Sequence, residues 1–172
     1  MMRRVLFTAL AFGLAACNQP AATTTVAEAE PAAPIVAEAP VAPSNAVFVN
    51  QSGVAAGGYD VVSFFKNAPA EGSAEFVSDV EGVKYQFASA ENKAAFDAEP
   101  VKFMPQFGGY CAYGAAEGHK APTKPETGQV INGKLYFNYN KSVQATFDKD
   151  QQGYIGKAEA NWDKIKADTV PG

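Results

Sequence analysis

Aromatic residues are concentrated in one part of this 172-residue chain. Eighteen of the 20 aromatic side chains follow residue 45, and the other two, Phe7 and Phe12, lie near the start. Aromatic side chains bury large apolar areas, so residues 46–172 can form one core of ordinary domain size without a disulfide. The sequence therefore predicts a single folded domain over 46–172 and a different role for the residues before it.

The N-terminus resembles the leader of bacterial lipoproteins. A short cationic start is followed by an apolar run over 5–14, which is too short to span a bilayer. Small residues then precede Cys17, as in a lipobox. The resemblance implies a signal peptide over 1–16, a lipid on Cys17 and a periplasmic location. Asn18 favours the outer membrane of a Gram-negative bacterium. An ordinary secretory peptide with a cysteine at its cleavage site is the alternative.

Residues 17–45 differ in composition from the rest of the chain. After Cys17 the stretch is mainly Ala, Pro, Thr, Val and Glu, with no aromatic residue and no Lys or Arg. Such a segment cannot bury enough apolar surface to offset the entropy of ordering. We therefore predict a disordered tether. A proline-rich recognition site is the alternative, but its PxxP spacings have no basic flanks.

Charge narrows the class of partner. The chain has 18 acidic and 14 basic residues, and cleavage of the leader would also remove Arg3 and Arg4. An acidic surface repels phosphate backbones and anionic headgroups, so we expect no nucleic-acid partner. The expected partners are the membrane, through the lipid on Cys17, and a periplasmic protein or small ligand.

The first of two hairpin-helix units is predicted near the start of the domain. Strands over 75–80 and 83–88 turn at Glu81-Gly82, and Ser89 caps a helix that ends near Pro100.

The second unit follows the same plan. Strands over 129–131 and 134–139 flank Asn132-Gly133, the strongest two-residue hairpin signal. Asn140 then caps a helix that carries Phe147.

The two units align at an offset of 51 residues. The identical pairs are Gly82 with Gly133, Tyr85 with Tyr136, Ala94 with Ala145, and Phe96-Asp97 with Phe147-Asp148. These identities indicate an internal duplication. Alternatively, they reflect only the need of any hairpin and helix for a turn glycine and an aromatic residue facing the core.

A last helix is predicted over 154–166. Ile155, Ala158, Trp162 and Ile165 form one apolar stripe at helical spacing, and we expect Trp162 to be a core residue. The predicted fold class is α+β. It is a small single domain with two hairpin-helix (ββα) units and a C-terminal helix, after a signal peptide and a disordered linker.

Motifs along the domain resemble those of the YHS-domain lipoproteins and exported proteins. These are 58–65 (GYDVVSFF), 85–96 (YQFASAENKAAF), 108–113 (GGYCAY), 132–141 (NGKLYFNYNK) and 160–162 (ANW). The wider family is similar to TRASH-type metal-binding modules, small treble-clef-like ββα units associated with copper and other heavy metals. The resemblance implies the metal signature Phe-Cys-Ser-x-x-Cys-x-x-x-Phe.

This chain departs from that signature at both cysteines. The frame runs from Phe87 to Phe96, and Ala88 and Asn92 stand at the cysteine positions. Cu(I) and structural zinc require thiolate or imidazole ligands, and neither alanine nor a neutral amide replaces them. We therefore expect no metal at this position and a domain that folds on its aromatic core.

Cys111 becomes the only unpaired thiol once Cys17 carries a lipid. The one histidine, His119, follows eight residues later, and glycines between them allow a turn. A copper or zinc site would use Cys111 and His119, with Met104, Asp60 or an open position beside them. Alternatively, Cys111 is a small buried residue in a closely packed helix, and His119 is a solvated loop residue.

A reactive thiol is the third interpretation. Tyr59, Tyr110 and Tyr113, with Asp60, could line a pocket around Cys111. Some members of the YHS family are selenoproteins, so the resemblance implies thiol or selenol chemistry at a position like that of Cys111. A cysteine nucleophile also needs a base and a group that orients the base, and only one imidazole is available. The chain has no Cys-x-x-Cys pair, paired-carboxylate, Gly-x-Ser-x-Gly or phosphate-loop signature, so no catalytic constellation is complete.

The sequence thus favours a membrane-anchored periplasmic YHS-like lipoprotein with a non-catalytic ligand- or protein-binding accessory role. The first alternative is a heavy-metal protein that binds or handles copper or zinc through Cys111 and His119. The second is a thiol-dependent redox enzyme. Whether the protein is an enzyme, and which ligand or partner it binds, stay open at this stage.

Overall fold

The computed structural model describes residues 46–170. The predicted signal peptide (1–16), the lipidation site at Cys17 and the predicted tether (17–45) lie outside the described residues. Within 46–170, no helix combines the length and the apolar character needed to cross a bilayer.

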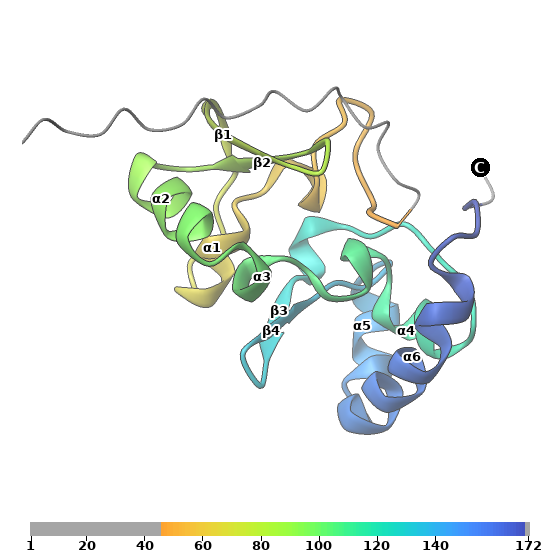
Figure 1. Ribbon diagram of the computed structural model, residues 1–172. Helices are drawn as coiled ribbons and strands as arrows, with labels where there is room; N and C mark the ends of the chain where they lie inside the picture. Colours follow the sequence, from red (N-terminus) through yellow and green to blue (C-terminus); the bar gives the residue numbers. More distant parts are fainter. Residues whose placement is uncertain (1–45, 171–172) are drawn as a thin grey trace, which may run out of the picture. The chain divides into compact units, whose positions relative to one another are not determined.

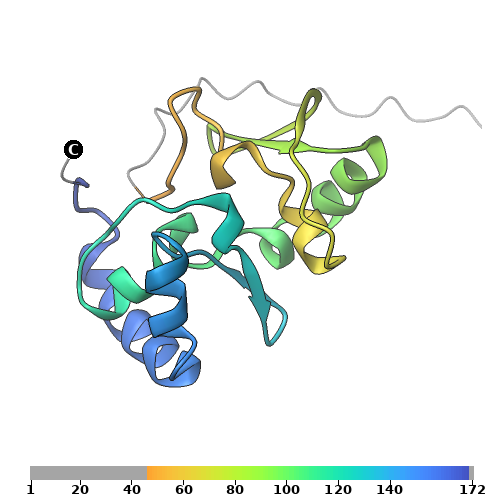
Figure 2. The same ribbon diagram turned by 180° about the vertical axis from the view of Figure 1, so that it is seen from behind.

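The described residues form the predicted α+β fold, with two antiparallel hairpins and several helices. In chain order the elements are η1 (Ala56–Gly58), α1 (Val61–Phe65), β1 (Ser73–Val80), β2 (Val83–Phe87), α2 (Ala90–Ala98), α3 (Pro100–Phe103), η2 (Gln106–Gly109), α4 (Ala112–Ala116), η3 (Pro125–Thr127), β3 (Gln129–Ile131), β4 (Lys134–Tyr136), α5 (Lys141–Phe147) and α6 (Gln151–Ile165). The hairpin β1–β2 lies near α1 and α2, whereas α4, α5 and α6 gather together, with β3–β4 between the two groups (Figures 1 and 2).

Both hairpins turn where the sequence predicts. Strand β1 pairs with β2 and β3 pairs with β4, both antiparallel. The turn residues Glu81-Gly82 and Asn132-Gly133 all have positive φ, as a tight two-residue hairpin turn requires. The predicted caps are also confirmed, because the Ser89 and Asn140 side chains accept backbone N–H bonds in the first turns of α2 and α5.

The second hairpin is shorter than predicted. Strand β4 ends at Tyr136, so the prediction of a strand through residue 139 is wrong. Phe137 instead pairs with Cys111 in an isolated parallel bridge. The backbone N–H and C=O of Asn138 both bond the Thr127 hydroxyl. The chain leaves the hairpin here because partners other than β3 satisfy its backbone groups.

Helix α6 begins at Gln151, earlier than the predicted residue 154, because the Asp150 side chain caps it by accepting from Gly153 N–H at 3.0 Å. Trp162 packs against the buried residues but is itself only partly buried, so the prediction of a core position is wrong. The short helix α1 was not predicted, since five residues are too few to show a helical period. The alternative that put Cys111 in a closely packed helix comes near the structure, in which α4 begins at the next residue.

Two clusters of buried side chains share strand β4. Leu135 and Phe137 belong to the first cluster, with Phe96, whereas Tyr136 belongs to the second, with Phe147. Successive side chains of an extended chain point to opposite faces, so this segment contributes to both clusters. The segment that begins with β4 thereby contributes buried side chains to both clusters.

The backbone repeats itself at the offset of 51 residues. Twelve of the thirteen described residues with positive φ form pairs at this offset, and Gly53 is the exception. The pairs are Ala56 with Phe107, Gly57 with Gly108, Gly58 with Gly109, Asn67 with Gly118, Glu81 with Asn132, and Gly82 with Gly133. Positive φ is uncommon outside glycine, so shared positions without sequence identity indicate a repeated backbone plan.

Hydrogen bonds follow the same offset. Asp60 N–H donates to Ala70 C=O at 3.0 Å, and Cys111 N–H donates to Ala121 C=O at 3.0 Å. We call residues 55–98 the first repeat and residues 106–149 the second repeat. The repetition extends beyond the two hairpin-helix units to the loop and the short helix that precede each of them.

Candidate functional site

The Asp60 side chain is the centre of a hydrogen-bond network in the first repeat. It is fully buried and caps helix α1, where its Oδ1 accepts from Val62 N–H at 2.8 Å and Ser63 N–H at 3.2 Å. Its Oδ2 accepts from Ala88 N–H at 2.9 Å and from Asn92 Nδ2 at 2.6 Å. Four N–H donors thus compensate the burial of one carboxylate, and they join α1 to the start of α2.

Cys111 takes the position of Asp60 in the second repeat. Its side chain is 1% exposed and caps helix α4, where Sγ accepts from Gly114 N–H at 3.3 Å. The backbone N–H groups of Tyr113 and Tyr139 also face the sulfur. Gly114, Tyr113 and Tyr139 are the equivalents of Ser63, Val62 and Ala88, so the same backbone donors that surround the carboxylate in the first repeat surround a thiol in the second.

Burial raises the pKa of the Cys111 thiol, and the N–H groups of Gly114, Tyr139 and Tyr113 oppose that shift without cancelling it. The protonated thiol has an acceptor, because Sγ lies 3.7 Å from Asn138 Oδ1 in donor geometry. The resting form is therefore a neutral thiol that donates to Asn138 and accepts from Gly114.

The Asn138 side chain is the buried partner of the Cys111 thiol. The residue is fully buried, and its Oδ1 also accepts from Tyr113 N–H at 3.2 Å. Its Nδ2 is the one buried side-chain N or O atom among residues 46–170 that has no hydrogen-bond partner. The equivalent residue in the first repeat is Phe87, which is fully buried in the first cluster. A polar side chain here is specific to the second repeat.

A cavity of about 310 Å³ opens over Cys111. Its lining residues are Cys111, Tyr113, Gly114, His119, Ala121, Tyr139 and Val143. They come from helix α4 and its cap, the loop that follows α4, the segment between β4 and α5, and the first turn of α5. Tyr139 is 47% exposed, one of the most exposed large apolar side chains in the described residues. The cavity is mostly apolar, with a thiol, an imidazole and two phenol hydroxyls as its polar groups.

Two residue differences between the repeats explain how the second repeat makes room. In the first repeat, Ser63 Oγ accepts from Ala70 N–H at 3.0 Å, and the Asn92 amide bonds Asp60. The equivalent positions are Gly114 and Val143, which have no polar side chain and line the cavity instead. The space beside the capping residue is bridged by hydrogen bonds in one repeat and open in the other.

The cavity brings together three of the site residues predicted from the sequence, Cys111, His119 and Tyr113. Tyr59, Asp60 and Tyr110 do not line it, so the proposed pocket of these residues around the thiol does not form. Asp60 is instead the equivalent of Cys111 in the first repeat, and Tyr59 and Tyr110 precede these two capping residues.

The remaining candidates for a metal site are separate. Met104 lines a groove with Trp162 and not the cavity with Cys111. Ala88 is exposed, and the Asn92 amide is bonded to Asp60. No group of three or more His, Cys, Asp or Glu side chains within residues 46–170 could hold a metal ion. Cys111 lies at the helix cap rather than inside a helix, and His119 is exposed in the following loop.

Sequence reasoning missed Asn138, Tyr139 and Val143. The offset of 51 could have found them, because it aligns them with Phe87, Ala88 and Asn92. The last two are the positions at which the metal signature has its cysteines. The alignment of the two hairpin-helix units already spans these positions, but only its extension back to Asp60 and Cys111 relates them to the thiol.

Comparison of the chain with models of known protein families, with curated proteins and with solved structures found no match.

Proposed function

We propose that this chain is a lipid-anchored periplasmic protein of the YHS-like type that binds a small ligand without transforming it. In this proposal the ligand occupies the cavity over Cys111, and the tether keeps the binding domain near the outer membrane. The single observation that supports the proposal most is the cavity itself, which lies where Ser63 and Asn92 of the first repeat are replaced by Gly114 and Val143. Its volume of about 310 Å³ is at the lower end of ligand pockets.

The lining residues favour an apolar ligand with one or two polar groups. Val143, Ala121 and the ring of Tyr139 offer apolar contact, and His119 and Tyr113 offer hydrogen bonds. A non-catalytic role fits the state of the thiol. Burial raises its pKa, and its hydrogen bonds run to Asn138 and Gly114 rather than to the imidazole. A nucleophilic cysteine requires the opposite arrangement.

Indole is a suitable probe, because it is small, apolar and carries one N–H donor. We would titrate it into ¹⁵N-labelled full chain that carries Cys17→Ser, so that Cys111 is the one thiol. The expected result is a saturable shift confined to the amides of Gly114, His119, Ala121 and Val143. Absence of such a shift for indole and for a panel of similar fragments would contradict the proposal.

Two variants test whether indole binds in the cavity over Cys111. Gly114→Ser restores the residue of the first repeat, and its Cβ would lie 3.2 Å from His119 O and 3.4 Å from Ala121 Cβ, so the added side chain narrows the cavity. Val143→Phe fills it from the other side. Each should weaken indole binding at least tenfold. The control is Gly156→Ala at an exposed position of α6, where a Cβ meets nothing within 4 Å, and it should leave the affinity unchanged.

A soft-metal site is the second candidate, and one observation favours it: Cys111 and His119 line the same cavity. Thiolate and imidazole are ligands that suit copper and zinc. Two donors are fewer than the three or four that zinc requires from a protein. Elemental analysis of the purified full chain and of Cys111→Ser separates the candidates. Stoichiometric copper or zinc that is lost in the variant would support metal handling and contradict the first proposal.

A further inference from the structure

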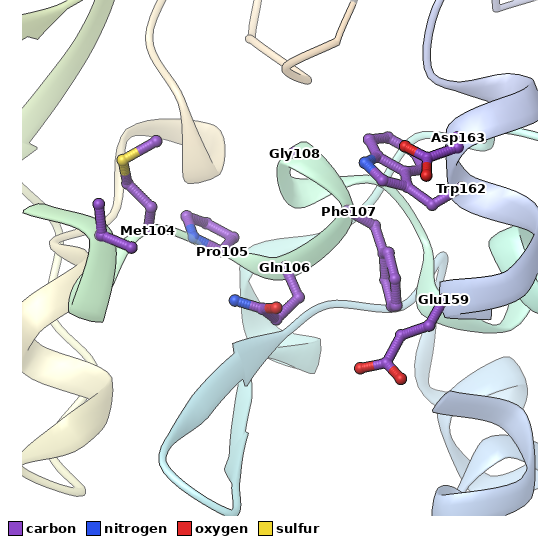
Figure 3. A pocket seen from close by; sticks show the side chains of 9 residues that line it. Met104, Pro105, Gln106, Phe107, Gly108, Glu159, Trp162 and Asp163 are labelled. Carbon is purple, nitrogen blue, oxygen red and sulfur yellow. The ribbon is translucent and has the colours of Figure 1, made fainter. Parts of the chain in front are cut away.

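A second hollow lies between the loop after α3 and helix α6. It is a groove of about 410 Å³ lined by Val101, Met104, Pro105, Gln106, Phe107, Gly108, Glu159, Trp162 and Asp163. Figure 3 shows Phe107 and Trp162 next to each other on the α6 side, with the Glu159 and Asp163 carboxylates, and Met104 and Pro105 on the opposite side. None of its nine lining residues is basic. None of them lines the cavity at Cys111.

Phe107 and Trp162 form the aromatic wall of the groove, and contacts between neighbouring rings fix its position. The Phe107 and Trp162 rings meet edge to face at 5.7 Å, and Tyr110 supports Trp162 at 6.2 Å. Phe107 is buried and has a left-handed backbone with φ of +53°. Trp162 is only partly buried, so indole surface remains available in the groove. Val101 at its edge is 82% exposed.

The acidic wall is formed by two carboxylates one turn apart on α6. Glu159 and Asp163 flank Trp162 at positions i and i+4, where like charges destabilise a helix. Lys134 lies 3.6 Å from Glu159, and Lys166 lies 2.8 Å from Asp163, with every side chain about half exposed or more. Such exposed ion pairs contribute little, so a cation in the groove could replace either lysine at small cost.

From this juxtaposition we propose that the groove lined by Trp162, Phe107, Glu159 and Asp163 binds a small organic cation, an ammonium with apolar substituents. The faces of aromatic rings attract such cations, and tryptophan attracts them most strongly. Met104, Pro105 and Val101 provide contact for the substituents, and the two carboxylates balance the charge. A divalent metal is a poor fit, since the described residues contain no group of three metal-binding side chains.

Trp162 is the only tryptophan of the chain, so its fluorescence reports on the groove directly. We would titrate the full chain with choline and with 3,3-dimethyl-1-butanol, its neutral isostere of the same shape. The expected result is a saturable change with choline and at least tenfold weaker binding of the neutral alcohol. Equal binding of the two, or no saturable change with choline, overturns the proposal whether or not any variant folds.

The carboxylates are tested by the double variant Glu159→Gln, Asp163→Asn. It should weaken choline binding at least tenfold, while the matched control Glu71→Gln, Glu75→Gln, which removes the same charge at exposed positions elsewhere, should stay within twofold of the parent. An unchanged affinity in the groove variant overturns the proposal. A dimer in sedimentation that protects Trp162 from acrylamide would show that a second copy fills the groove, and it would overturn the proposal as well.

Discussion

Cys111 caps helix α4 in the position in which Asp60 caps helix α1, 51 residues earlier in the chain. Each accepts a backbone N–H from the third residue after it, Ser63 in one repeat and Gly114 in the other. One repeat therefore places a carboxylate, and the other a thiol, in the same arrangement of backbone donors. The carboxylate is fully committed to its own repeat, whereas the thiol faces a cavity.

The two capping residues should differ in their contribution to stability. Asp60→Ala leaves four N–H donors without their acceptor, three of them buried, and we expect a loss of about 3–5 kcal/mol. Cys111→Ala removes weaker bonds to sulfur and should cost about 1 kcal/mol. Urea unfolding of the Cys17→Ser chain and of both variants measures the difference. Equal losses would contradict the different roles assigned to the two residues.

The Cys111 thiol should behave as a poorly reactive group. Because burial raises its pKa, the rate of alkylation by iodoacetamide should keep rising above pH 9 in the folded Cys17→Ser chain, and level off earlier in urea. The folded state holds this proton more tightly than the unfolded state does. Stability from this group is therefore complete below the ordinary thiol pKa and falls as pH rises from that value toward the raised one. A rate profile that levels off below pH 8 would favour the redox alternative.

Tyr85 gives a second pH dependence with the same sign. Burial, and the carboxylate of Glu81 to a smaller extent, raise its pKa from 10.0 to about 12. The unfolded chain thus ionises first as pH rises. The free energy of unfolding should therefore fall by roughly 3 kcal/mol between pH 10 and pH 12, at 1.36 kcal/mol per pH unit. Tyr85→Phe should remove this slope. Parallel pH profiles of the unfolding free energy for parent and variant would show that the phenol is not the cause.

Local signals predicted the hairpins well, and the site less well. Glycine-containing turns and the caps Ser89 and Asn140 depend on neighbouring residues alone, so the sequence shows them directly. The cavity depends on which side chains the repeat brings around Cys111, and its lining residues Tyr139 and Val143 are distant in the chain. Asn138 was missed for the same reason, since it lies 27 residues from Cys111 in the chain and only the fold brings its amide next to the thiol.

Helix α6, which carries Glu159, Trp162 and Asp163, provides a matched pair of glycine substitutions. Gly156 is exposed and a Cβ there meets nothing within 4 Å, so Gly156→Ala should stabilise the fold by about 0.5–1 kcal/mol through helix propensity.

The other member of the pair, Gly153, donates its N–H to the Asp150 cap, and a Cβ would lie 2.1 Å from Asp150 Oδ2. Gly153→Ala gains the same propensity but displaces the cap, which is worth about 1 kcal/mol, so it should be neutral or destabilising. Thermal unfolding of the two variants side by side measures the contrast. A Gly153→Ala chain as stable as Gly156→Ala would mean that the Asp150 cap does not set the start of α6.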